Sequence, residues 1–133
     1  MSSVFELAEQ PTSVIVKAIR GGLPARAFSQ VADAMMLSKE ALAKKLGIAT
    51  RTVNRKQNAK QTLSAGETEK ILRVARIRNL AGELFTSKEA ISEWLVKPAS
   101  PLGNIAPIDM LDTDVGARDV EGYIRGLLYG NFL

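Results

Sequence analysis

The sequence predicts an all-α fold, and three observations lead to that expectation. Apolar residues recur at helical spacing along most of the 133 residues, and no segment alternates apolar and polar residues as a strand does. Serine, threonine, glycine and proline stand where these apolar series begin and end. No internal repeat is found. We expect two closely packed helical parts, residues 1–80 and residues 81–133, joined by a long helix.

Before residue 37 we expect a short helix or a docking arm over residues 12–20, and then a helix over residues 24–36. An apolar series over residues 12–20 begins beside Thr12 and Ser13, either of which would cap a helix, and it stops at a pair of glycines. Pro24 follows as the first-turn proline of a helix over residues 24–36. The apolar face of this second helix is expected to pack inward.

Residues 38–56 predict two short helices folded about Gly47. Ala43 is the small residue at which the helices touch, Gly47 permits the sharp turn, and Val53 anchors the second helix from inside. The outer side of that second helix is basic and polar. These intervals are typical of a helix-turn-helix that enters a DNA groove.

Positive charge surrounds this motif. Residues 39–60 hold seven Lys and Arg and a single acid, so the segment has a formal charge of +6. We expect Thr50 to cap the second helix, so that its hydroxyl and the free N–H groups meet a phosphate, while polar residues of the first turns reach base edges. The candidate DNA-binding residues are Lys39, Thr50, Arg51, Thr52, Asn54, Arg55 and Lys56. The alternative is an ordinary helical hairpin with a solvated basic face.

A polar connector follows the motif, and we expect residues 56–63 to be a loop. Ser64 and Glu67 then predict a capping box at the start of the longest helix in the chain. Thr86 and Glu89 have the same spacing and predict a second capping box. Both boxes mark helix starts without any need for long-range contacts.

The last third of the chain predicts an irregular turn and two helices. Three prolines and a Gly-Asn pair make residues 98–107 irregular, with the Gly or the Asn at positive φ. Pro107 opens a short helix. A last helix begins at Thr113 or Asp114 and ends at Gly130.

Composition excludes several classes of function. The chain has no Cys and no His, which removes disulfides, thiolate metal sites, the cysteine nucleophile and the commonest general base. No phosphate loop, nucleotide-binding glycine fingerprint or serine elbow occurs. The acids between residues 109 and 121 match no calcium loop and are explained by caps and a solvated face. We therefore expect no enzyme, no metal ion and no cofactor.

No secretory signal is recognised, and no apolar run approaches the roughly 20 residues of a membrane span. We expect a soluble protein of a reducing cytoplasm, without a membrane partner.

Charge divides the chain into two unlike halves. Residues 1–80 carry +8, from 14 Lys and Arg against 6 Asp and Glu, and residues 81–133 carry −4, from 4 against 8. This division favours two partners of different chemistry; unevenly solvated surfaces are the alternative. Apolar Tyr129, Phe132 and Leu133 lie at the C-terminal end, where they either fold back on the chain or insert in a partner's cleft.

A set of short motifs occurs in a fixed order along nearly the whole chain. They are Gly22-Leu23-Pro24, Leu46-Gly47-Ile48, Arg51-Thr52-Val53, Leu63-Ser64, Trp94-Leu95, Leu102-Gly103 and Pro107. This order resembles that of the Xre-type antitoxins of the Xre/MbcA/ParS group, the partners of RES-domain toxins. The chain departs from the group at Asn104, where a second glycine is usual, but Asn tolerates positive φ.

The resemblance implies a DNA-binding domain over residues 1–80 and a toxin-binding domain over residues 81–133. Members of the group block the active site of a toxin that degrades cellular NAD, and they repress their own operon. The implied partners are a RES-domain toxin and operator DNA, with a homodimer or a larger hetero-oligomer with the toxin. The residues expected to bind the toxin are Leu102, Arg125, Tyr129, Gly130, Asn131, Phe132 and Leu133. The alternative is a stand-alone repressor whose C-terminal domain only dimerises or senses a ligand.

Overall fold

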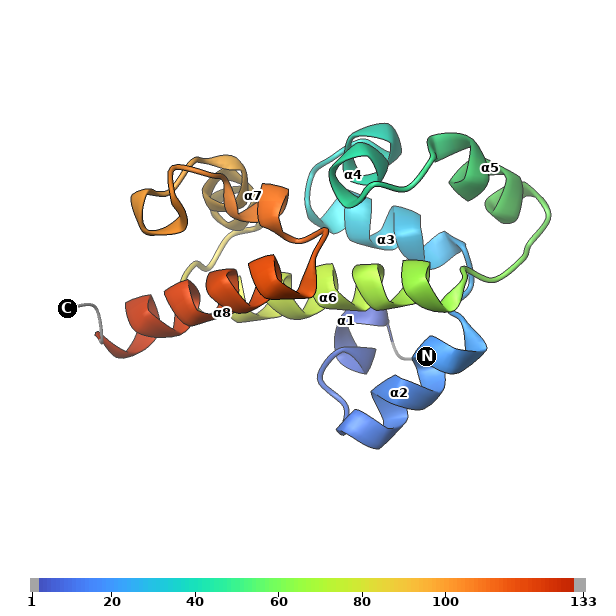
Figure 1. The fold of residues 1–133 in the computed structure, drawn as a ribbon, viewed down its shortest axis with the longest axis horizontal. Helices are drawn as coiled ribbons and strands as arrows, with labels where there is room; N and C mark the ends of the chain where they lie inside the picture. Colours follow the sequence, from blue (N-terminus) through green and yellow to red (C-terminus); the bar gives the residue numbers. More distant parts are fainter. Residues whose placement is uncertain (1–2, 131–133) are drawn as a thin grey trace.

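The computed structural model describes residues 3–130, and within them the chain is helical, as predicted (Figure 1). Eight α-helices and two 3₁₀ helices follow one another in this range. Its only extended pairings are two isolated bridges, Pro24 with Thr62 and Ala99 with Ile105. No described helix is both long and apolar enough to cross a bilayer.

Helix α6 (Ala65–Ala81) is the longest described helix and runs along the middle of the molecule (Figure 1). It begins with the predicted capping box. The Ser64 hydroxyl accepts from the Glu67 N–H at 3.1 Å, and the Glu67 carboxylate accepts from the Ser64 N–H at 2.8 Å. Two backbone donors that a helix start would leave unpaired are thereby satisfied.

Helices from both ends of the chain pack on α6. Its neighbours are α1 (Val4–Leu7), α2 (Thr12–Gly21), α3 (Arg26–Ala34) and α8 (Asp114–Tyr129). In Figure 1, α1 and α2 lie below α6 and α3 lies above it. The central helix therefore joins the N-terminal and C-terminal parts.

Helices α4 (Lys39–Leu46) and α5 (Thr50–Asn58) form the predicted helix-turn-helix. Gly47 ends α4 with a φ of 69°, the left-handed conformation that glycine adopts without strain. Ala43 and Val53 are both 0% exposed, so the predicted contact and anchor positions are confirmed. The turn thus fixes which face of α5 points outward.

The C-terminal part is a series of short helices that leads to α8. The chain passes through α7 (Lys88–Val96), η1 (Ser100–Leu102) and η2 (Pro107–Met110). Between the two 3₁₀ helices, Gly103 and Asn104 have φ values of 72° and 63°. The expectation that Asn104 tolerates a positive φ is confirmed.

One hydrophobic core runs through both parts of the molecule. The cluster of buried side chains extends from Val4 in α1 to Ile124 in α8, and α6 contributes Ile71 and Ile77 to it. A partly buried polar contact adds to this core, since the Leu23 N–H donates to the Thr68 hydroxyl at 3.1 Å. The two parts are therefore packed as one body.

Several predicted helix starts are wrong. The residue that precedes α2 is Pro11, without a capping side chain, so neither Thr12 nor Ser13 is the cap. The cap position of α5 is Ala49, and Thr50 is the first helical residue. Local spacing indicates that a helix starts nearby, but the first residue depends on where packing lets the backbone bonds begin.

The second capping box and several helix lengths also differ from expectation. Ser87, not Thr86, caps α7, by accepting from the Ala90 N–H at 3.0 Å. The connector over residues 56–63 is shorter than predicted, because α5 continues to Asn58. The expected helix over 24–36 is the shorter α3, and α1 and η1 were not predicted. Short elements carry too little periodicity to be recognised in a sequence.

Candidate functional site

The outer face of α5 presents a row of polar and basic side chains. Asn54 and Arg55 lie three and four residues after Arg51, and Asn58 lies four and three residues after them, so all four share one face of the helix. Arg51, Arg55 and Asn58 are exposed, whereas Val53 is buried on the opposite side. Asn58 is not among the residues predicted from the sequence, because the sequence predicts a loop over residues 56–63 and α5 in fact continues to Asn58. This face has the donors that contact base edges and phosphates.

The seven cations of residues 39–60 fall into two groups. Three of them are held by partners in the fold: Lys39 Nζ donates to Gln57 Oε1 at 2.9 Å, Lys45 Nζ to Asp109 Oδ1 at 2.7 Å, and Lys56 Nζ to Glu67 Oε1 at 2.6 Å. The other four have no ion pair within residues 3–130, and they are Lys44, Arg51, Arg55 and Lys60.

Lys56, one of the predicted DNA-binding residues, is largely enclosed in an ion pair. Its side chain is 15% exposed and that of Glu67 is 17% exposed, so the pair is largely enclosed. Burial by itself raises the pKa of Glu67, but hydrogen bonds from Lys56 and Ser64 outweigh that effect and lower the pKa below its ordinary value. The Lys56 ammonium therefore helps to hold α5 on the start of α6.

A hydrogen-bonded glutamine fixes α5 against α3. Gln57 Nε2 donates to the Ala25 carbonyl at 3.2 Å and to Ser29 Oγ at 2.8 Å, and its Oε1 accepts from Lys39. The nitrogen and the oxygen of the Gln57 side-chain amide therefore both form hydrogen bonds within the protein. Lys39, a predicted DNA-binding residue, is the first residue of α4 and supports the position of α5 through this amide.

The two predicted threonines lie in the first turn of α5, and both are half-buried. Thr50 and Thr52 do not cap the helix, and Ala49 offers no side-chain acceptor to its first N–H groups. A helix start without a capping side chain leaves N–H donors for another acceptor.

The far end of α8 has a different surface. Leu127 is 42% exposed and Tyr129 is 63% exposed, so apolar side chains are uncovered there. Arg125 Nη2 lies 3.6 Å from Glu121 Oε1, which also lies 3.8 Å from Arg76 Nε. The one predicted cation of this end is therefore already paired.

The remaining predicted toxin-binding residues have mixed positions. Leu102 is 7% exposed and belongs to the core, and Gly130 ends α8 with a φ of 68°. Beneath α8, Trp94 packs against Tyr123 and Phe85, with ring centroids 5.5 Å and 6.1 Å away. The other predicted residues, Asn131, Phe132 and Leu133, lie outside the described residues.

Two family models match the chain. The Antitoxin Xre-like helix-turn-helix domain matches residues 14–76, and the Antitoxin Xre/MbcA/ParS C-terminal toxin-binding domain matches residues 80–130. The Antitoxin Xre of Photorhabdus laumondii is 30% identical over 110 residues, which are 82% of this chain and 74% of that relative. The chain belongs to the Xre/MbcA/ParS antitoxin family.

Two further relatives match most of this antitoxin. The Prs ADP-ribosylating antitoxin of Sphingobium is 29% identical over 126 residues, 86% of this chain and 77% of the relative. The Antitoxin Xre of Yersinia enterocolitica is 26% identical over 121 residues, 90% of this chain and 82% of the relative. The family gives this antitoxin a DNA-binding helix-turn-helix and a toxin as a partner, and the resemblance seen in the sequence is confirmed at that level.

No cluster of metal-ligating side chains occurs in the described part of this antitoxin. Three of the acids between residues 109 and 121 have cationic neighbours instead. Asp109 pairs with Lys45, Asp114 with Arg118 at 2.9 Å, and Glu121 with two arginines. The interpretation of these acids as helix caps is wrong, because Ala106 and Thr113 stand at the cap positions of η2 and α8.

Proposed function

We propose that this antitoxin neutralises a RES-domain enzyme that degrades NAD, in the cytoplasm, by covering the enzyme's active site. The covering surface is the C-terminal end of α8 together with residues 131–133. The observation that carries this proposal is the exposure of large apolar side chains at that end, where Tyr129 is 63% exposed. Exposed aromatic side chains next to neutralised charges are typical anchors of protein interfaces.

Charge supports the choice of an NAD-binding enzyme. A pocket that holds the phosphates of NAD is expected to be basic, and residues 81–133 carry a formal charge of −4. ADP-ribosylation, the reaction in the name of the Sphingobium relative, also consumes NAD. Inhibition by occlusion needs no catalytic group on the antitoxin, and the chain contains neither His nor Cys.

We further propose that α5 enters the major groove of an operator and represses the antitoxin's own operon. Arg51, Asn54 and Arg55 would read base edges, and the uncapped start of α5 at Thr50 would meet a phosphate. Two copies of the chain are needed for a symmetric operator. Lys39 and Lys56, because they are held by Gln57 and Glu67, would position α5 instead of contacting bases.

Deletion of residues 130–133 tests the toxin-binding proposal. The full chain and the shortened chain are each co-expressed with a RES-domain toxin that the full chain binds, and cellular NAD is measured. We expect the full chain to preserve NAD and the shortened chain to lose most of that protection, with operator binding unchanged. If both chains protect NAD equally, residues 130–133 take no part in neutralising the toxin.

Replacement of Arg51 and Arg55 by Ala tests the DNA proposal. Each lost base contact is expected to cost about 1–3 kcal/mol, so operator affinity should fall by a factor of about 30 or more. The matched control replaces Lys88, the first residue of α7, and Lys97, the residue after its end; both are exposed, so the control removes the same charge elsewhere. If both double variants bind operator equally well, α5 is not the reading helix.

A further inference from the structure

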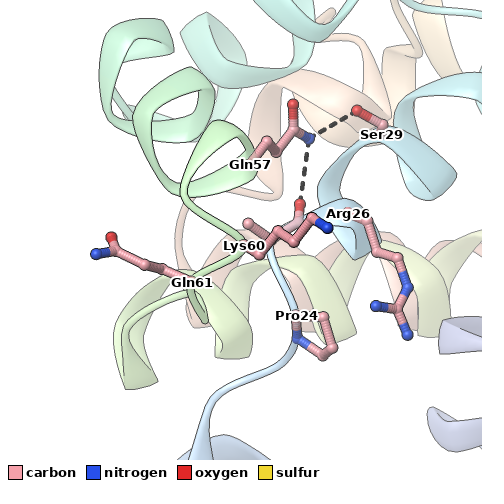
Figure 2. Close-up of a pocket in the computed structure, with 7 residues that line it drawn as sticks. Pro24, Arg26, Ser29, Gln57, Lys60 and Gln61 are labelled. Atoms are coloured by element: carbon pink, nitrogen blue, oxygen red, sulfur yellow. Dashed lines mark hydrogen bonds between the residues drawn. The ribbon is translucent and has the colours of Figure 1, made fainter.

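A cleft of about 560 Å³ opens between the start of α3 and the end of α5 (Figure 2). The residues that line it come from two segments: Pro24, Ala25, Arg26, Ser29, Gln57, Lys60 and Gln61. None of these lining residues is acidic. The wall is therefore built from two cations, three neutral polar residues and the apolar Pro24 and Ala25.

The two cations of the cleft have no acidic partner within residues 3–130. Arg26 and Lys60 are both exposed, and neither belongs to any of the ion pairs in that range. Figure 2 shows Lys60 below Gln57, with its ammonium end turned toward Arg26. Nearby Lys39 and Lys56, by contrast, are bound to Gln57 and Glu67. The cleft therefore keeps two positive charges available to an outside anion.

The backbone presents Lys60 in an unusual conformation. Its φ is 53°, in the left-handed region that residues with a Cβ seldom occupy. Hydrogen bonds hold this turn, since the Gln61 N–H donates to the Lys56 carbonyl at 2.8 Å and the Ala25 N–H donates to the Gln61 carbonyl at 3.1 Å. The second of these bonds ties the turn to the segment that carries Arg26. The backbone positions of Arg26 and Lys60 are therefore fixed relative to each other.

Neutral donors complete the wall. Because Ser29 Oγ accepts a hydrogen bond from Gln57 Nε2, its own O–H remains available to donate. The Gln57 amide is fixed by its bonds to Ala25 and Ser29, so this side of the cleft is rigid. Guanidinium, ammonium and hydroxyl donors around one space are the groups that bind phosphate oxygens.

We propose that this cleft binds a phosphodiester of the DNA backbone, beside the groove that α5 enters. The inference rests on the proposed DNA-binding function and extends it to a second segment of the chain. Gln57 lies in the last turn of α5 and Lys60 is two residues past the end of that helix at Asn58, so the cleft lies at the C-terminal end of the helix that carries Arg51 and Arg55. Its volume exceeds that of a single phosphate and leaves room for the adjoining sugars. A contact of this kind fixes the register of the helix on the duplex and carries no sequence information.

The test compares Arg26→Gln, Lys60→Gln and the double variant with the full wild-type chain. Operator DNA and an unrelated duplex are titrated over a series of salt concentrations. We expect each single substitution to lower the affinity for both duplexes about tenfold. The slope of log affinity against log salt concentration should become shallower by about 0.9. The control is Lys88→Gln with Lys97→Gln. Unchanged affinity and slope in the Arg26 and Lys60 variants would overturn the proposal.

Failure of this inference is distinguishable from failure of the proposed function. If the Arg51 and Arg55 variant loses operator affinity while the cleft variants keep it, DNA binding stands and the cleft is not part of it. If the Arg51 and Arg55 variant also binds like wild type, the proposed function itself fails.

A second experiment tests whether the cleft binds the phosphate of the DNA backbone or a free phosphate ion. Inorganic phosphate is titrated into the DNA-free protein while the amide signals of Arg26 and Lys60 are followed by NMR. We expect no saturation at millimolar phosphate, because the cleft is open and needs the rest of the duplex for affinity. Saturable phosphate binding combined with unaltered DNA binding of the cleft variants would assign the cleft to a free anion instead.

Lys60→Gly shows whether weaker DNA binding comes from the lost charge or from a less stable fold. Glycine adopts the left-handed φ of this turn without strain, so the unfolding midpoint of the variant should rise. Its DNA affinity and salt slope should fall as in Lys60→Gln. A variant that is more stable yet binds DNA as tightly as wild type would contradict the proposed site.

Discussion

The exposed faces of α5 and α8 differ in which side chains are left without a partner. On α5 the apolar Val53 is fully buried, while Arg51 and Arg55 have no ion pair among the described residues. On α8 the arrangement is reversed, because Arg125 is paired with an acid while Tyr129 is exposed. A polyanion binds free cations, whereas a protein surface binds uncovered apolar groups once nearby charges are neutralised. The two faces therefore suit two different kinds of partner.

The two surfaces lie at opposite ends of a single packed body (Figure 1). Polar contacts join their supporting elements through α6. Lys70 Nζ donates to the Leu46 carbonyl at 2.7 Å, and Arg73 Nη1 donates to the Leu111 carbonyl at 3.1 Å. These bonds connect the end of α4 and the end of η2 to the same helix.

The largest expected effect follows Gly116→Ala in the first turn of α8. A Cβ at this position would meet the Met110 carbonyl, which is backbone and has little freedom to move. We expect the free energy of unfolding to fall by about 3 kcal/mol and toxin binding to weaken with it. Urea unfolding and toxin titration measure both.

Gly122→Ala is the control for this change, because a Cβ at that position in the same helix would have no neighbour within 4 Å. This variant should be slightly more stable, since alanine favours the helix. Operator binding is measured without urea, where Gly116→Ala is still folded. If the variant binds operator more weakly under these conditions, the two ends of the molecule are not independent.

A smaller effect is expected from Tyr129→Ala, which removes the most exposed aromatic side chain of α8. If Tyr129 anchors the toxin, the affinity for it should fall about 30-fold, corresponding to about 2 kcal/mol. Operator affinity should not change. Val14→Ala, which alters an exposed apolar residue of α2, should leave toxin affinity close to wild type. Equal affinities for both variants would show that exposure at the end of α8 does not mark the interface.

The next effect concerns Lys56 and Glu67, which pair near the end of α5. It is measured as the change in the free energy of unfolding with pH. The folded state lowers the pKa of Glu67 below its ordinary value of 4.5, so the pair stabilises the protein above that pH and loses its effect as the pH falls through the folded-state pKa. Glu67→Gln keeps an acceptor for the capping box but leaves Lys56 without a counter-ion. We expect it to cost about 1 kcal/mol at neutral pH and nothing once the pH lies below the folded-state pKa.

Glu69→Gln on the same helix is the matched control, because Glu69 is exposed and has no ion pair in residues 3–130. Urea unfolding at a series of pH values measures both variants. A cost of Glu67→Gln that stays constant down to acidic pH would exclude the ion pair as its cause.

The smallest expected effect concerns Lys45 and Asp109, which link α4 to η2. Their side chains are 27% and 45% exposed, so solvent weakens the attraction. A double-mutant cycle with alanine should give a coupling of about 0.5 kcal/mol. The more exposed pair of Arg118 and Asp114 should give less. A coupling well above 1 kcal/mol would mean that this pair joins the two ends more tightly than surface pairs do.

The sequence by itself determined the helical class, the turn at Gly47, the capping box at Ser64 and the helix end at Gly130. Each of these depends on residues within four positions of one another, so spacing and backbone preference suffice. The positive φ of Asn104 was predictable for the same reason. The resemblance to antitoxins likewise rested on the order of short local motifs.

Only the tertiary structure decided which of the expected site residues are available. Lys45 meets Asp109 across 64 positions of the chain, and Lys56 is enclosed against Glu67. Leu102, expected on the toxin surface, lies in the core. The cleft near Lys60 joins segments more than 25 residues apart. Long-range pairs depend on how helices pack against α6, and this geometry is not contained in the spacing of residues along any one helix.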